Sequence, residues 1–172
     1  VEHESESVAR VPGGKTLRVV CAKEGSAKYV GEILLEHGYA DVAYMQEGIK
    51  AWGNMLDPVR VGGNDGYELF QFQRPGKASC RYGLISGGEM MVFDPAKNVA
   101  AYQAFANANV CRITRTFETH RQADYISGSQ TLHQTAGVEI IAPEPDFKGA
   151  RFSYSPVSDG DIYTFTKSGP QI

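Results

Sequence analysis

A single cysteine stands where a strand-like segment gives way to a helix-like one. Residues 16–21 (TLRVVC) form a short β-branched run that ends in Cys21, and apolar residues at helical spacing begin after Ser26. In such a loop, free backbone N–H groups and the helix dipole favour an anionic sulfur, and Lys23 adds positive charge. We interpret Cys21 as a candidate persulfide carrier, with Lys23, Gly25 and Ser26 supporting the loop. An unreactive cysteine packed at a strand end is the alternative.

The residues around Cys21 alternate between strand and helix patterns. Residues 26–37 have apolar side chains at helical spacing, and Gly38 follows them as a typical C-terminal cap. Residues 41–45 predict a second strand, and residues 46–55 predict a second helix. This βαβα order predicts two parallel strands, because a crossover helix joins them.

This stretch resembles the C-terminal half of a rhodanese domain. The matching features are the strand, cysteine, loop and helix in that order, the LEHGY turn at residues 35–39 and the GIKAW ending at residues 48–52. The resemblance implies that Cys21 is the nucleophile that forms a persulfide. It defines a partial rhodanese-like unit over residues 16–58, preceded by a polar N-terminal tail over residues 1–15. The arginine often found in the rhodanese loop and the first half of the domain are missing from the chain.

A different pattern begins after residues 57–66 (DPVRVGGNDG), where turn-forming residues predict a boundary. Two apolar runs flank Gly87 and Gly88 within residues 84–93, which predicts an antiparallel hairpin. We expect further strands at residues 67–72, 110–118, 138–142, 152–154 and 162–165, and helices at residues 97–107 and 127–135.

Residues 117–128 (FETHRQADYISG) have a second chemically suggestive pattern. Together with ASCRY at residues 78–82 and VFDP at residues 92–95, they resemble the N-terminal part of the metallo-β-lactamase fold. The likeness is closest to the persulfide dioxygenase branch, which is often fused to rhodanese domains. The fold class implied is α/β: a partial rhodanese-like parallel βαβα unit, then a partial metallo-β-lactamase-like αβ region with antiparallel strands over residues 59–172.

The resembled family has a T-H-x-H-x-D-H metal motif at the end of a strand. His120 and Asp124 stand at its first histidine and its aspartate, whereas Gln122 and Tyr125 replace the other two histidines. An amide is a poor ligand for zinc or ferrous iron, and a phenol must first lose a proton with a pKa of about 10. The family's downstream ligands would lie beyond Ile172. We therefore expect no metal cofactor, neither iron nor zinc, and interpret His120 and Asp124 as a hydrogen-bonded remnant.

Composition restricts the possible partners of the 172-residue chain. Its formal net charge of −3 provides no bulk positive field, so we expect no nucleic-acid partner. No stretch approaches the roughly 20 apolar residues of a membrane span. Cys21, Cys80 and Cys111 are widely spaced and form no CxxC pair, which favours an intracellular, reducing compartment over a disulfide framework.

The loss of metal ligands and of half a rhodanese domain favours a pseudoenzyme. We predict a non-catalytic binding or structural accessory subunit of a larger assembly, with other protein chains as partners that cover unpaired sheet edges. The alternative is a sulfurtransferase in sulfur metabolism that carries a persulfide on Cys21 and passes the sulfur to a thiol or to cyanide. A metal-dependent persulfide dioxygenase or hydrolase is the least supported hypothesis.

Overall fold

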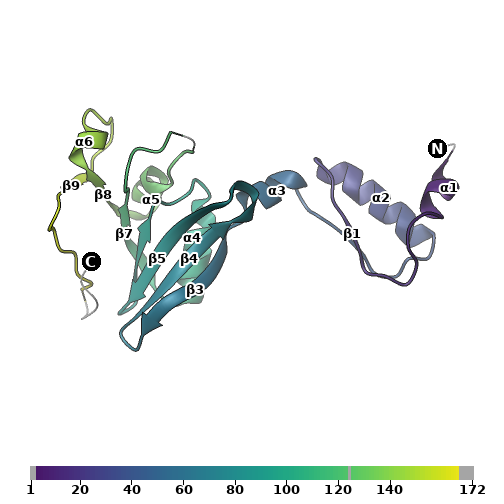
Figure 1. Ribbon diagram of the computed structural model, residues 1–172, viewed down its shortest axis with the longest axis horizontal. Coiled ribbons are helices and arrows are strands. Elements are labelled where there is room, and N and C mark those ends of the chain that lie inside the picture. Colours follow the sequence, from purple (N-terminus) through teal and green to yellow (C-terminus); the bar gives the residue numbers. More distant parts are fainter. Residues whose placement is uncertain (1–2, 124, 167–172) are drawn as a thin grey trace. The chain divides into compact units, whose positions relative to one another are not determined.

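The chain folds into two compact units, Val1–Met55 and Leu56–Ile172 (Figure 1). The computed structural model describes residues 3–123 and 125–166. The boundary predicted from the sequence falls after residue 58. The structure is α/β, with a small parallel sheet in the first unit and a larger mixed sheet in the second, as the sequence predicts.

The first unit consists mainly of two short parallel strands and one long helix. Strands β1 (Leu17–Val19) and β2 (Val42–Tyr44) pair with Leu17 opposite Val42, and helix α2 (Glu24–Glu36) connects them. Gly31 of α2 lies over the side chains of Val42 and Tyr44, so the helix covers one face of the pair. Helix α3 (Ile49–Asn54) follows β2 and completes the predicted βαβα order.

The segment predicted to be a polar tail, residues 1–15, includes a short helix, α1 (Glu4–Val8). The hydroxyl of Tyr39 donates hydrogen bonds to the carbonyl oxygens of Val8, at 3.2 Å, and Val11, at 2.7 Å. These long-range contacts attach the segment to the turn after α2. No periodic pattern of residues predicts these contacts, because one tyrosine hydroxyl makes both of them.

The second unit contains a seven-stranded sheet in the order β3-β4-β5-β6-β7-β8-β9. Strands β3 to β6 are antiparallel, whereas β6 to β9 are parallel. The strands are β3 (Asp57–Asn64), β4 (Tyr67–Arg74), β5 (Ser79–Ser86), β6 (Glu89–Phe93), β7 (Arg112–Phe117), β8 (Glu139–Pro143) and β9 (Ser155–Val157). The helices are η1 (Pro75–Lys77), α4 (Val99–Ala108), α5 (Ser129–Ala136) and α6 (Glu144–Phe147).

Local sequence signals account for several of these elements. Gly87 and Gly88 have φ values of 58° and 80°, which confirms the predicted two-residue hairpin between β5 and β6. The Oγ of Ser127 accepts a hydrogen bond from the N–H of Ser129 at the start of α5. Gly137 ends α5 in the left-handed conformation, with φ of 66°.

Three sequence predictions of local structure are wrong. Residues 57–66, predicted as a turn-rich boundary, instead contain β3, an edge strand where Pro58 and a bulge near Gly62 are tolerated. Residues 152–154 are not a strand, because pairing with β8 begins only at Ser155. Residues 162–165 form no strand either. The side chains of Tyr163 and Phe165 pack in the apolar cluster around Met91, and the carbonyl of Thr164 accepts a hydrogen bond from Arg115.

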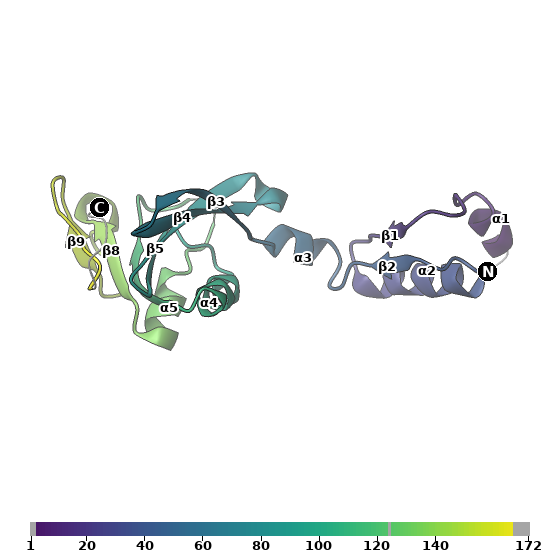
Figure 2. The same ribbon diagram turned by 90° about the horizontal axis from the view of Figure 1, so that it is seen from below.

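Two apolar clusters cover the two faces of the larger sheet. Helices α4 and α5 lie on one face, where Tyr102 and Leu132 pack with Met90 and Val92 of β6 (Figure 2). On the other face, Met91 packs with residues that include Phe165 of the C-terminal segment. The alternation of Met90, Met91 and Val92 across the sheet therefore builds a core on both faces.

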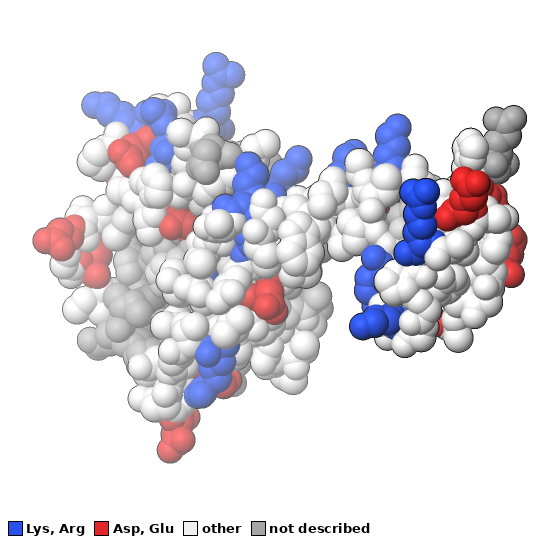
Figure 3. Space-filling view, turned by 45° about the vertical axis from the view of Figure 1, so that its right-hand side comes forward, with Lys and Arg blue, Asp and Glu red and all other residues white. Residues whose placement is uncertain are grey.

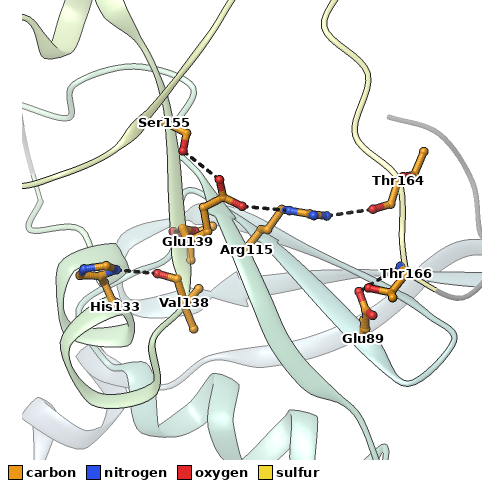
Figure 4. Close-up of polar contacts among 9 residues, drawn as sticks. Glu89, Arg115, His133, Val138, Glu139, Ser155, Thr164 and Thr166 are labelled. Carbon is orange, nitrogen blue, oxygen red and sulfur yellow. Dashed lines mark hydrogen bonds and ion pairs between the residues drawn. The ribbon is translucent and has the colours of Figure 1, made fainter.

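Polar side chains fasten the C-terminal segment near the starts of the parallel strands (Figure 4). The Nε of Arg115 lies 3.2 Å from Oε2 of Glu139, and its Nη1 donates a hydrogen bond of 2.8 Å to the carbonyl of Thr164. The N–H of Thr166 donates to Glu89 over 3.4 Å. These contacts hold Phe165 in place, which is only 4% exposed.

Candidate functional site

Cys21 lies in the loop between β1 and α2, with its side chain partly exposed. The backbone N–H of Lys23 is the main cause that lowers the pKa of the thiol. Partial burial opposes this effect, whereas the N–H of Ala22 and the hydroxyl of Ser26 add to it. The structure thus brings Lys23 and Ser26 to the sulfur as hydrogen-bond donors, an arrangement that suits a thiolate.

Gly25 is the third residue that was predicted to support the loop. It lies in the first turn of α2, where an added Cβ would meet no atom within 4 Å. No close approach therefore requires glycine at this position.

Gly48 positions the Cys21 loop from the other side. It is buried and has a φ of 62°, and a Cβ added there would lie 2.7 Å from the carbonyl oxygen of Cys21. The next residue, Ile49, donates its N–H to the same oxygen at 3.1 Å. The sequence signal for this contact was the GIKAW ending, which carried the family resemblance but predicted no contact with the cysteine.

A second candidate site lies in the loops that follow β6 and β7. Asp94 adopts a positive φ of 50° directly after β6, and both of its carboxylate oxygens bind Thr119. One oxygen accepts the N–H of Thr119 at 2.8 Å, and the other accepts its hydroxyl at 2.7 Å. The ring Nδ1 of His120 lies 2.9 Å from the same hydroxyl and 3.3 Å from the amide nitrogen of Gln122. The structure therefore places His120 and Gln122 together, as neighbours in a hydrogen-bonded loop.

Tyr125 is held against the sheet. The guanidinium carbon of Arg81 lies 4.3 Å from the centre of its ring, and its hydroxyl donates a long, 3.5 Å hydrogen bond to the carbonyl of Asp94. Burial raises the pKa of the Tyr125 hydroxyl well above its usual range, and the nearby Asp94 carboxylate raises it further. The phenol is therefore protonated near neutral pH, when it is a weak metal ligand. Asp124, predicted to be a remnant of the motif, lies outside the described residues.

Glu118 is a buried acidic group that was not among the site residues predicted from the sequence. It is 4% exposed, and its Oε1 accepts hydrogen bonds from the hydroxyls of Ser127 and Ser129. Burial raises the pKa of its carboxyl, whereas the two serine hydroxyls partly offset that effect. A glutamate directly after β7, with two serines downstream, was the only sequence signal for this group.

Glu118 lines a cavity of about 250 Å³ next to this loop. Its polar wall includes Arg121, Gln122 and Asp146, and its aromatic wall includes Phe147 and Phe152. The N–H of Arg121 donates to the carboxylate of Asp146 over 3.3 Å, which links the loop after β7 to α6.

The described part of this site does not fit a transition metal. Residues 3–123 and 125–166 contain no group of three or more His, Cys, Asp or Glu side chains able to hold a metal ion. At the motif positions that the structure describes, the side chains are the imidazole of His120, the amide of Gln122 and the protonated phenol of Tyr125. Zinc and iron prefer imidazole, thiolate and carboxylate ligands, so this donor set provides one suitable ligand.

Comparison with known proteins identifies the fold. No protein-family model and no curated protein matches the chain. A solved metallo-β-lactamase from Staphylococcus aureus subsp. aureus COL aligns with a TM-score of 0.55 at 20% sequence identity, covering 61% of this chain and 33% of that chain. ETHE1 from Myxococcus xanthus aligns with a TM-score of 0.49 at 18% identity, covering 56% of this chain and 43% of that one.

The first of these structures shows that the chain contains part of the metallo-β-lactamase fold. The chain spans about a third of the length of that protein. This confirms the fold predicted from residues 78–128, whereas the rhodanese-like identity of the first unit stays a prediction.

The contact between Gly48 and Cys21 predicts the behaviour of the variant Gly48→Ala. Its new Cβ forces the loop away, so the N–H groups of Lys23 and Ala22 no longer stabilise the thiolate, and the pKa of Cys21 rises. We expect alkylation of Cys21 by iodoacetamide, followed by peptide mass spectrometry across pH, to have a higher midpoint and a rate at pH 7 lower by about threefold. Gly53→Ala is the matched control, since no atom lies within 4 Å of its new Cβ. An unchanged pH profile in Gly48→Ala would contradict this role.

Proposed function

We propose that this chain is a non-catalytic binding or structural subunit of a larger assembly. The observation that carries the proposal is the incomplete cover of the first unit. Its β1–β2 pair has α2 on one face, whereas Arg18 and Ala43, which point the other way, are exposed. Parallel sheets in proteins are normally covered on both faces, so this arrangement favours a further protein layer.

The first unit also buries little apolar surface of its own. Among its described residues, the buried apolar side chains are Ala27 and Leu34. A unit of this size rarely reaches independent stability without a larger core or a partner. An apolar groove of about 260 Å³ between α1 and α2, lined in part by Val8, Tyr29 and Ile33, offers additional surface for contact.

Large apolar side chains are exposed on the same unit. Trp52 is 42% exposed and Leu35 is 50% exposed. The other exposed members of this set are Val20, Tyr29, Val30, Ile49 and Met55. Tryptophan, tyrosine and methionine are enriched at protein interfaces, and buried tryptophans there often dominate the binding energy.

Charge and hydropathy favour protein partners over nucleic acid or lipid. The net charge is −3, and Figure 3 shows acidic and basic side chains separated by broad uncharged regions on the face drawn. Within the described ranges, no helix is both long and apolar enough to cross a membrane. The loss of suitable metal ligands around His120 also supports a role without metal chemistry.

The variant Trp52→Glu tests the proposal. We expect the full-length protein from its source to migrate with the native mass of a larger complex, and Trp52→Glu to weaken that association about thirtyfold, as a loss of about 2 kcal/mol predicts. Lys50→Glu is the matched control, because Lys50 is an exposed residue of the same helix. A native mass equal to that of the single chain, in wild type and both variants, would refute the assembly role.

A second candidate function is sulfur transfer through Cys21, favoured by the hydrogen bonds that lower the pKa of its thiol. In this reaction the thiolate attacks the outer sulfur of thiosulfate, releases sulfite and becomes a persulfide. Cyanide then takes the terminal sulfur as thiocyanate and regenerates the thiolate.

Thiocyanate formation from thiosulfate and cyanide tests this candidate. We expect Cys21→Ser to lose the activity almost completely if Cys21 is the carrier. Cys80→Ser, which removes an exposed cysteine of the second unit, is the control that leaves the rate unchanged. Equal rates in wild type and Cys21→Ser would exclude Cys21 as a sulfur carrier.

A further inference from the structure

Arg81 is a buried cation close to the loop that follows β7. It lies on β5 and is only 2% exposed, and its Nε has no hydrogen-bond partner among the described residues. A cation taken out of water needs compensating contacts, because desolvation of a charge is costly. The face of the Tyr125 ring, 4.3 Å from the guanidinium carbon, provides one such contact.

Arg81 is directed toward the apolar core beneath α4. Side chains of a strand alternate between the two faces of a sheet, so Arg81, Gly83 and Ile85 of β5 share one face. Ile85 belongs to the same apolar cluster as Tyr102 of α4. The hydroxyl of Tyr102 accepts the N–H of Ala96 at 3.0 Å, so this core also fixes the loop after β6.

A continuous series of contacts runs from Arg81 to the former metal motif. Arg81 lies over Tyr125, the Tyr125 hydroxyl reaches the carbonyl of Asp94, and the Asp94 carboxylate binds Thr119. Thr119 in turn contacts the His120 ring at 2.9 Å. These side-chain contacts thus join the loops after β6 and β7.

We propose that the Arg81 guanidinium replaces the metal of the resembled fold, by anchoring the loop after β7 through Tyr125 and by keeping divalent cations out. A positive charge fixed in the sheet attracts the electron-rich face of the ring. The same charge disfavours the binding of a divalent cation beside Tyr125, because like charges repel each other. The described donor set, which provides one suitable ligand, agrees with this replacement.

The anchoring part of the proposal is tested by thermal unfolding of the full chain. Arg81→Met and Tyr125→Leu each break the pair, and we expect each to lower the midpoint by about 4 °C or more. The combined variant adds little to either loss, because the contact is already absent. Tyr125→Phe retains the ring and most of the midpoint, and Arg151→Met, which removes an exposed cation, is the control.

The comparison of Tyr125→Phe with Tyr125→Leu needs no change at Arg81, so it remains informative if Arg81→Met does not fold. Equal losses in these two Tyr125 variants would overturn the anchoring role. A lower midpoint of the wild type after treatment with EDTA would also overturn it, since the loop would then depend on a metal.

The exclusion of cations is tested by restoring ligands. The variant Gln122→His/Tyr125→His supplies two imidazoles next to His120, and zinc binding is measured by calorimetric titration with zinc chloride. We expect zinc to bind about tenfold more tightly, or better, when Arg81→Met is added. The same zinc affinity with and without Arg81 would show that the guanidinium does not exclude the metal.

Discussion

The need to cover both faces of a parallel sheet governs this structure. In the second unit, the parallel strands β6 to β8 meet this need from within the chain. Helices α4 and α5 supply Tyr102 and Leu132 on one face, and Phe165 packs on the other. In the first unit, α2 covers one face of the β1–β2 pair, while Arg18 and Ala43 remain exposed on the other. The two units therefore differ in how much of their own stability they can supply.

The carboxyl ends of the parallel strands show how the fold satisfies its polar groups through side-chain hydrogen bonds. Asp94 joins the loops after β6 and β7 through Thr119, and Glu118 is held by the hydroxyls of Ser127 and Ser129. The buried Arg81 supplies positive charge at Tyr125. Side-chain hydrogen bonds and a cation–π contact thus join the loops at this edge of the sheet.

Much of the fold could be predicted because its elements are locally encoded. The strand before Cys21, the helix that ends near Gly38 and the Gly87–Gly88 hairpin all have short-range signals, and each is confirmed. Strand β3 was missed because proline and glycine usually mark turns, whereas an edge strand has an unpaired side that accommodates them. Helix α1 was missed because its position depends on the hydroxyl of Tyr39, far along the chain.

The candidate sites were only partly predictable for the same reason. The Cys21 loop is a local feature, and Lys23 and Ser26 in it lower the pKa of the Cys21 thiol. Arg81 and Gly48 act through contacts with residues distant in sequence, Tyr125 and Cys21 respectively, so periodicity and motif spacing carried no signal for them.

The central claim is that the first unit is completed by another protein, and backbone hydrogen exchange tests it most directly. The exchange of α2 amides is compared between the isolated chain and the chain within material purified from its source. The account predicts that protection of α2 rises about tenfold or more in the assembly, while that of β5 and β6 stays the same. Equal protection of α2 in both samples would contradict it, because the first unit would then be complete on its own.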